Sequence, residues 1–190
     1  SADEFVDGGL TLEDQKLFAK RLQEARVDVI DVSGGIYEAS YWIVPPMGFP
    51  LGTLVHLAAG IKEVVSVPVI GVGRILHPVL AESILESGQA DFVAMGRATH
   101  CDPEWPKKAM EGRLDDIRVC IACDECVQIM FDQLPTTCAI NAECGHERAL
   151  AIKPAQTKKK VLVVGAGPAG MEAARVLKLR GHSVSVVERA

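Results

Sequence analysis

Residues 161–189 read VLVVGAGPAGMEAARVLKLRGHSVSVVER and predict a complete βαβ unit. The apolar strand VLVV runs into the glycine turn GAGPAG, and a helix follows as far as Leu179. Gly181 terminates this helix before a second apolar strand that ends at Glu188. A G-x-G-x-x-G turn in this context binds the phosphates of a nucleotide. We therefore predict the start of a Rossmann-type nucleotide-binding domain at residues 160–190.

The glycine turn also indicates which ligand it would bind. Its glycines allow a tight turn, close approach of a pyrophosphate to the backbone and close helix–strand packing. The residues concerned are Gly165, Gly167, Pro168 and Gly170. Glu188 stands where a carboxylate can accept hydrogen bonds from a ribose. Pro168 and Ala169 between the glycines resemble flavin-dependent pyridine-nucleotide oxidoreductases, which favours FAD over NAD; a purely structural glycine turn is the alternative.

Upstream of a solvated linker at residues 153–159, the stretch 118–138 reads RVCIACDECVQIMFDQLPTTC. It contains four of the six cysteines in the pattern C-x2-C-x2-C-x11-C: Cys120, Cys123, Cys126 and Cys138. A tight triplet with a distant fourth cysteine is the spacing of ferredoxin-type loops. We therefore predict a [4Fe–4S] cluster on these four residues.

Two other readings of the cysteines remain open. Zinc is the first, because Cys144 and His146 offer a late pair of ligands. Buried structural thiols are the second. Cys101 lies far from the loop in sequence, so we expect an ordinary thiol there, and the pattern does not explain Cys144.

Between residues 11 and 112, helical and β-branched segments alternate. Helices are expected at residues 11–25, 51–65, 77–88 and 102–112, and strands at residues 27–35, 67–74 and 90–97. Short apolar strands between helices are typical of parallel βα units. They fit an open sheet or part of a (β/α)8 barrel equally well.

The run at residues 71–123, from GVGRILHP to RVCIAC, resembles the end of the old yellow enzyme-type barrel in one flavoenzyme family. This is the family of 2,4-dienoyl-CoA reductase, enoate reductase and trimethylamine dehydrogenase. The resemblance implies the C-terminal part of an FMN-binding (β/α)8 barrel at residues 1–112 and an iron–sulfur segment at residues 113–152. A FAD or ADP domain would begin at residue 160, and the chain would be an internal piece of a longer protein.

The resemblance also implies residues that bind FMN. Gly73 with Arg74 and Gly96 with Arg97 follow successive strands, where such barrels form a phosphate site. Glycine lets backbone N–H groups approach the phosphate, and arginine adds a charge-assisted bond. Each arginine alone could instead make a surface ion pair. Three residues past the preceding strand should border the flavin: Ser33, Gly34 and Gly35.

The family's proton donor is a histidine, and this chain has Tyr37 at the matching position. A tyrosine can donate a proton to a developing enolate, although its ordinary pKa is near 10. Tyr37 could equally only line the pocket. The aromatic residues Tyr41, Trp42 and Phe49 would shape a substrate pocket or form a packed loop.

These features together predict an NAD(P)H-dependent oxidoreductase that reduces α,β-unsaturated carbonyl compounds. Hydride from NAD(P)H would enter FAD, electrons would cross the cluster, and FMN would reduce the substrate. The cysteine spacing shares features with both dienoyl-CoA reductase and trimethylamine dehydrogenase, so an amine dehydrogenase remains an alternative. A zinc-stabilised nucleotide-binding module without catalysis is the alternative from another class. We expect these 190 residues alone to bind FMN weakly and to be inactive.

Composition limits the partners. A net charge of −5 and a pI near 5.5 argue against a nucleic-acid surface or a basic membrane patch. No apolar run approaches the ~20 residues of a membrane-spanning helix, so we expect a cytoplasmic protein. Its expected partners are a small-molecule substrate, the rest of its own longer chain and, in a homo-oligomer, further copies.

Overall fold

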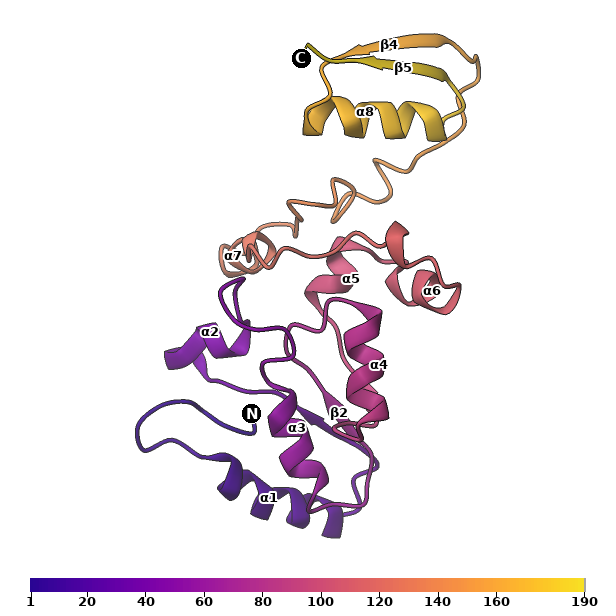
Figure 1. Cartoon of the computed structure of the whole chain (residues 1–190). Helices are drawn as coiled ribbons and strands as arrows, with labels where there is room; N and C mark the ends of the chain where they lie inside the picture. Colours follow the sequence, from indigo (N-terminus) through magenta and orange to yellow (C-terminus); the bar gives the residue numbers. More distant parts are fainter. Residues whose placement is uncertain (190) are drawn as a thin grey trace. The chain divides into compact units, whose positions relative to one another are not determined.

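The computed structural model describes residues 1–189 and divides the chain into two compact units, Ser1–Gly145 and His146–Ala190. Both units combine helices with parallel strands, which confirms the predicted α/β class (Figure 1). No helix in the described part of the chain has the length and apolar character needed to cross a membrane.

The first unit contains a parallel sheet whose strands lie side by side in chain order. The strands are β1 (Ile30–Val32), β2 (Val69–Gly71) and β3 (Phe92–Val93). The helices that alternate with them are α1 (Leu12–Glu24), α3 (Val55–Lys62) and α4 (Pro78–Glu86). Parallel neighbours need such crossovers, so the predicted βα units are confirmed.

Local sequence explains where these helices begin and end. At the start of α1, the Thr11 backbone N–H donates to Asp14 Oδ2 at 2.9 Å, as part of a capping box. At the start of α4, Pro78 occupies the first turn and His77 Nδ1 accepts from the Val79 backbone N–H. Gly88 follows α4 with φ +69°, a conformation that glycine adopts at little cost.

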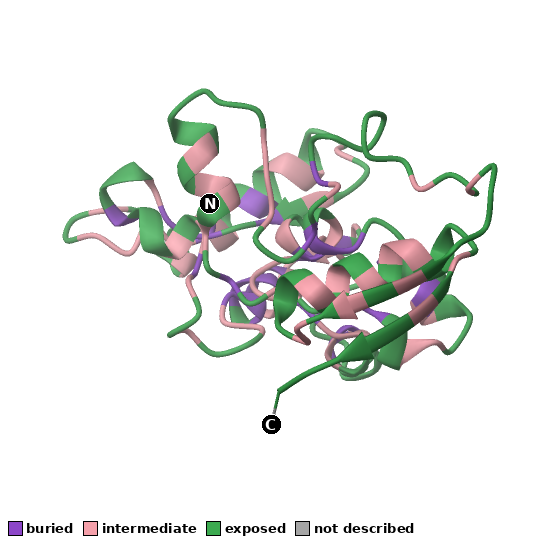
Figure 2. Cartoon of the chain, turned by 90° about the horizontal axis from the view of Figure 1, so that it is seen from above, coloured by how far each residue is buried: buried purple, intermediate pink, exposed green. Residues whose placement is uncertain are grey.

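The core of the first unit lies between α3 and the sheet. Leu57 and Ala58 of α3 and Val69 of β2 are 1% exposed or less. Gly71 lets the helix approach the strand, because a Cβ there would lie 3.3 Å from the Cβ of Ala58. The buried segments in Figure 2 belong to this unit, and no residue from 146 to 189 is buried.

All three strands predicted in the first unit are shorter than expected, and the segment 27–35 is a strand only over Ile30–Val32. The segment 67–74 is extended only over Val69–Gly71, because Gly73 and Arg74 have φ +114° and +53° and leave the β region. The segment 90–97 pairs only at Phe92–Val93, and a short helix that we did not predict, α5 (Arg97–Cys101), follows it. Both Gly–Arg steps therefore lie in turns beyond the ends of neighbouring strands.

The cysteine segment contains a helix that we did not predict. After α6 (Trp105–Met110) and the 3-10 turn η2 (Leu114–Asp116), the helix α7 (Glu125–Phe131) begins inside the cysteine triplet. The chain as far as Gly145 clusters with the first unit.

The second unit contains β4 (Lys160–Val164), α8 (Pro168–Leu179) and β5 (Ser183–Val187). The two strands are parallel, and Lys160 pairs with Ser183 and Val164 with Val187. This order confirms the predicted strand–turn–helix–strand unit.

Candidate functional site

A cavity of about 460 Å³ lies at the carboxyl ends of β2 and β3. Its walls are residues 43–45, 72–76 and 94–98, together with His100, Cys126, Val127 and Met130. Both Gly–Arg steps therefore line one cavity, and their role as a phosphate site stays a prediction. One of the four motif cysteines lines it as well.

The Gly73–Arg74 step is fixed by packing. A Cβ on Gly73 would lie 2.7 Å from the Cβ of Leu54 and 2.9 Å from its backbone nitrogen, so only glycine fits. Arg74 donates from Nη1 to the Met47 carbonyl at 3.1 Å. Its Nε is buried and has no hydrogen-bond partner in the protein. A buried N–H without an acceptor is costly, so an anion in the cavity would stabilise this arrangement.

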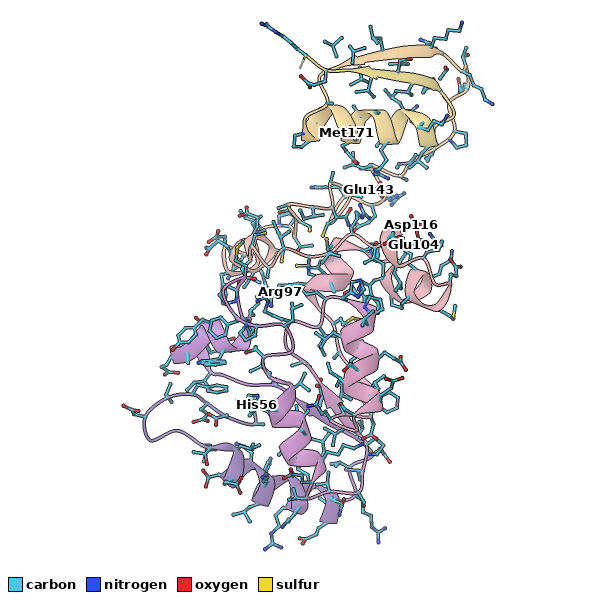
Figure 3. All side chains as sticks on the ribbon, in the orientation of Figure 1. His56, Arg97, Glu104, Asp116, Glu143 and Met171 are labelled. Carbon is cyan, nitrogen blue, oxygen red and sulfur yellow. The ribbon has the colours of Figure 1, made fainter. Side chains whose placement is uncertain are left out.

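The Gly96–Arg97 step has open space beside its backbone and brings a second guanidinium to the cavity. A Cβ on Gly96 would meet nothing within 4 Å, so the space beside this backbone is open. Arg97 begins α5 (Figure 3), and its Nη1 pairs with the Asp124 carboxylate. Two arginines and an open glycine on one cavity fit the phosphate of FMN in size and charge.

The glycines after β1 do not line this cavity. Gly35 has φ +82°, and a Cβ there would lie 2.7 Å from the Ile43 backbone nitrogen. The Gly35 N–H donates to the Asp3 carbonyl, and the Ser33 carbonyl accepts from the Ala2 N–H, both at 2.7 Å. Gly34 is buried against Leu57 and Phe5. In the structure these residues hold the first residues of the chain against β1.

Tyr37 lines a neighbouring cavity of about 270 Å³. Its side chain is 81% exposed, and the opposite wall is formed by Val127, Met130 and Phe131 of α7. Tyr41 lines this cavity too. Ile43, Val44, Val127 and Met130 line both cavities, so the two cavities are neighbours.

The remaining aromatic side chains form a packed loop. Trp42 stacks on Phe5 with ring centroids 4.0 Å apart and meets Phe49 edge-on at 4.9 Å. Neither Trp42 nor Phe49 lines the two cavities. Of the two readings left open by the sequence, packing describes Trp42 and Phe49, whereas Tyr41 faces the cavity.

The four motif cysteines lie within electrostatic range of one another. Burial raises the pKa of the Cys120 thiol, and Cys138 and Cys123 raise it further. Burial also raises the pKa of the Cys126 thiol, and Cys120 and Cys138 add to this shift. Arg97 opposes both shifts. The backbone turns tightly here, because Ala122 and Asp124 both have left-handed φ, of 52° and 59°. The Ala122 N–H donates to the Cys120 sulfur at 3.3 Å.

The positions of the four motif cysteines bear on which kind of metal centre they could bind. Within residues 1–189, no three His, Cys, Asp or Glu side chains converge on a point that would hold one metal ion. A cubane carries an iron at each ligated corner, so it holds four thiolates further apart than a single ion does. Four thiols on one segment supply the donor type that a [4Fe–4S] cluster needs.

Cys101 lies closer to the cysteine loop than its place in the sequence indicates. It is fully buried at the end of α5 and lies within electrostatic range of Cys138 and Cys120. Burial, together with Cys138 and Cys120, raises the pKa of its thiol to about 12. A fifth cysteine therefore lies beside the cysteine loop. No spacing rule could find it, because α5 brings it there from a distant part of the chain.

A buried polar network joins the cysteine segment to α5 and α6. Asp102 is fully buried and accepts from Lys108 Nζ at 2.6 Å and from the Arg118 N–H at 2.9 Å. Arg118 also donates to the buried Asn141 at 3.0 Å, and Asn141 donates to the His100 carbonyl at 2.9 Å. These bonds fix both ends of the loop that carries the four cysteines.

Asp102→Asn should lower the free energy of unfolding by about 3–5 kcal/mol, because it leaves the Lys108 ammonium buried without a counter-charge. Urea unfolding of the natural protein, followed by tryptophan fluorescence, would measure the change. Lys107→Gln is the matched control. Its ion pair with Glu104 spans 3.6 Å between side chains that are both 57% exposed, and its loss should cost below about 1 kcal/mol. Equal losses of unfolding free energy in the two variants would contradict the stabilising role of the buried pair of Asp102 and Lys108.

The same network makes a prediction about pH. Burial acts to raise the pKa of Asp102, but bonds from Lys108, Arg118 and Glu104 outweigh it, and the pKa is lowered. A lowered pKa contributes stability above the ordinary range of the carboxyl, and this stability is lost as pH falls through the folded-state value. Asp102→Asn should therefore lose less stability than the natural protein below about pH 4.

In the second unit, each glycine of the turn has a distinct surrounding. Gly165 has φ +107°, and its N–H donates to the Val187 carbonyl at 2.8 Å. A Cβ on Gly170 would collide with the Gly165 carbonyl oxygen, whereas a Cβ on Gly167 would meet nothing within 4 Å. Glu188 Oε2 accepts from the Ala166 N–H at 2.6 Å, so the predicted ribose-binding acid lies at the turn.

The fold and the cavity define an α/β protein with a cavity lined by two arginines at the ends of parallel strands, beside a cysteine loop. The sequence profile of the NADH:flavin oxidoreductase / NADH oxidase family matches residues 1–116, and that of the pyridine nucleotide-disulphide oxidoreductases matches residues 93–190. The chain belongs to the NADH:flavin oxidoreductase / NADH oxidase family, whose members are flavin-dependent oxidoreductases.

Individual relatives are similar over nearly the whole chain. An NADH oxidase of Thermoanaerobacter brockii is 51% identical over 100% of this chain and 30% of its own length. A cinnamate reductase of Clostridium sporogenes is 38% identical over 98% of this chain and 28% of its own. The chain thus spans about a third or less of the length of these relatives.

Solved structures give the same picture. A 2-naphthoyl-CoA reductase in complex with 2-naphthoyl-CoA superimposes with a TM-score of 0.92, at 36% identity, over 97% of this chain and 29% of its own. Histamine dehydrogenase from Rhizobium sp. 4-9 superimposes with a TM-score of 0.86, at 33% identity, over 99% of this chain and 28% of its own.

Proposed function

We propose that this chain belongs to an NAD(P)H-dependent iron–sulfur flavoenzyme that reduces α,β-unsaturated carbonyl compounds. The observation that carries the proposal is the cavity lined by both Gly–Arg steps and by Cys126. It supports the proposal because two arginines that would bind the FMN phosphate and a cysteine that would ligate the cluster line the same cavity. Electron transfer between two centres requires such proximity. The consecutive parallel strands of the first unit support its assignment to a (β/α)8 barrel.

Each proposed cofactor would be held by specific residues. Arg74 and Arg97 would bind the FMN phosphate, with the backbone of Gly73 and Gly96 beside it. The four motif cysteines would ligate the cluster. When bound, FAD, the cluster and FMN would supply hydride acceptance from NAD(P)H, single-electron relay and reduction of the substrate, respectively.

The second unit would bind the adenosine half of FAD. Open space at Gly167 would admit the pyrophosphate, and the first turn of α8 would favour its charge. Glu188 would exchange its bond with the Ala166 N–H for hydrogen bonds to the ribose.

Reduction is favoured over amine oxidation by two similarities, to a cinnamate reductase and to a 2-naphthoyl-CoA reductase. The similarity to histamine dehydrogenase supports the second candidate, an amine dehydrogenase. Anaerobic assays of the natural protein would separate the two. We expect NADH oxidation that depends on added cinnamate or a dienoyl-CoA. Amine-dependent reduction of a dye without NADH consumption would support the second candidate instead.

Tyr37→Phe should lower kcat for enoyl reduction by about 100-fold, the usual loss of a general acid. The reason is that Tyr37 lines a cavity next to the proposed flavin site. Tyr41→Phe is the matched control, because it removes a hydroxyl from the same cavity, and its kcat should change less than about threefold. Stopped-flow measurement of the substrate half-reaction would isolate this step. Similar rates in both variants would leave Tyr37 with a lining role only.

A further inference from the structure

The ion pair between Arg97 and Asp124 joins the proposed flavin cavity to the cysteine loop. Arg97 begins α5, directly after the second Gly–Arg step, and lines the cavity. Asp124 lies between Cys123 and Cys126. Their side chains are only 12% and 25% exposed, so the pair is largely shielded from solvent.

Arg97 lies between two regions, the cavity and the cysteine loop. On one side the residue lines the cavity with Gly73 and Arg74. On the other side its guanidinium pairs with Asp124, which lies within the cysteine triplet. Cys126 lines the same cavity, so no further layer of protein separates the two regions at this point.

The backbone of Asp124 supports a special role for its side chain. The residue adopts φ 59° and ψ 14° immediately before α7, a left-handed conformation that costs most side chains about 1–2 kcal/mol and that Asp and Asn tolerate better. An aspartate at this position usually caps the helix, but the Asp124 carboxylate makes no cap bond. It binds Arg97 instead.

We propose that Arg97 is shared by the FMN phosphate and the cluster, and that Asp124 is the residue that positions it between them. This inference rests on the proposed function, because it assumes that FMN and the cluster occupy the two sides of this wall. One cation then contributes to phosphate binding and also stabilises the more negative, reduced state of the cluster.

The shared role predicts effects of opposite sign. Arg97→Gln removes a positive charge and should shift the cluster potential negative, while Asp124→Asn removes a negative charge and should shift it positive. Arg97→Gln should also weaken FMN binding about tenfold, the loss expected for a charge-assisted bond to phosphate. Asp124→Asn should leave FMN binding within about twofold, because the guanidinium remains available to the phosphate.

The test uses anaerobically purified holoprotein. Redox titration followed by EPR gives the cluster potential, and fluorescence titration of the deflavinated protein with FMN gives the dissociation constant. We expect each variant to change the ratio of reduced to oxidised cluster about threefold at a fixed potential, which corresponds to about 30 mV for one electron. Arg97→Lys should keep the potential near that of the natural protein but bind FMN more weakly, because lysine lacks the planar fork.

Glu125→Gln is the matched control, since it removes the same charge one residue away from an exposed side chain. Equal potential shifts in Asp124→Asn and Glu125→Gln would overturn the positioning role of Asp124. An unchanged potential in Arg97→Gln, with weakened FMN binding, would overturn the shared role of Arg97. If Arg97→Gln does not retain its cofactors, a potential shift in Arg97→Lys as large as that in Asp124→Asn would overturn it equally. A natural protein without iron or FMN would overturn the proposed function itself.

Discussion

Cys123→Ser is expected to remove most of the iron and the broad visible absorption of the cluster from the anaerobically purified natural protein. Cys123 is the central member of the triplet and is exposed, so little of the fold depends on its packing. A cubane needs a thiolate at each corner, and a serine hydroxyl is a poor replacement. Iron and acid-labile sulfide analysis would measure the loss, which we expect to exceed about tenfold.

Cys101→Ala provides the control for this experiment. Cys101 lies beside Cys138 and Cys120 but outside the predicted ligand set, so its variant should keep nearly full iron. Loss of iron in Cys101→Ala with retention in Cys123→Ser would show that Cys101, and not Cys123, is a cluster ligand. Zinc in place of iron and sulfide in the natural protein would support the zinc-stabilised module instead.

Local patterns in the sequence predicted most of the fold. The unit of β4, α8 and β5 follows from VLVV, GAGPAG and Gly181, because each signal acts within a few residues of the element that it sets. The two Gly–Arg steps were also predicted to meet. This inference required only that parallel neighbouring strands end at one edge of a sheet. Both steps line one cavity, and their role as a phosphate site stays a prediction.

The sequence was less informative where a contact joins distant segments. Cys101 reaches Cys138 through the short helix α5, whose five residues carry no periodic signal. The pair of Arg97 and Asp124 was missed because both residues already had a local reading, one as a phosphate ligand and the other as a residue between two cysteines. Long-range pairs of this kind depend on tertiary packing, which spacing within one segment cannot encode.

The glycines after β1 show a different limit. Ser33, Gly34 and Gly35 were expected to border the flavin, since glycines at a strand end allow close approach of a ligand. In the structure the space at Gly35 is filled by the backbone of Ile43, and Gly34 meets Leu57 and Phe5. A glycine marks a close approach, but the sequence does not say whether the approaching group is a ligand or the protein itself. Their flavin-binding role stays a prediction.

The three glycines of the nucleotide turn allow that distinction to be tested directly. A Cβ at Gly170 would collide with the Gly165 carbonyl oxygen, so Gly170 is required by the protein. A Cβ at Gly167 would meet no protein atom within 4 Å, and its φ of −67° suits any residue. Only a bound ligand gives a reason for glycine at position 167.

Gly167→Val is therefore expected to leave the fold intact and to reduce FAD occupancy by at least about 100-fold, because the valine side chain takes the space that a pyrophosphate would need. FAD released from the denatured protein, quantified against FMN in the same sample, measures the effect, and FMN should be retained.

Ala173→Val, on an exposed position of α8, adds the same kind of bulk away from the turn and should keep its FAD. Gly170→Val should lose FAD together with the structure of the second unit, visible as increased proteolysis after residue 145. Full FAD occupancy in a folded Gly167→Val protein would show that the turn binds no dinucleotide, and recovery of ADP instead of FAD from the natural protein would favour the amine dehydrogenase.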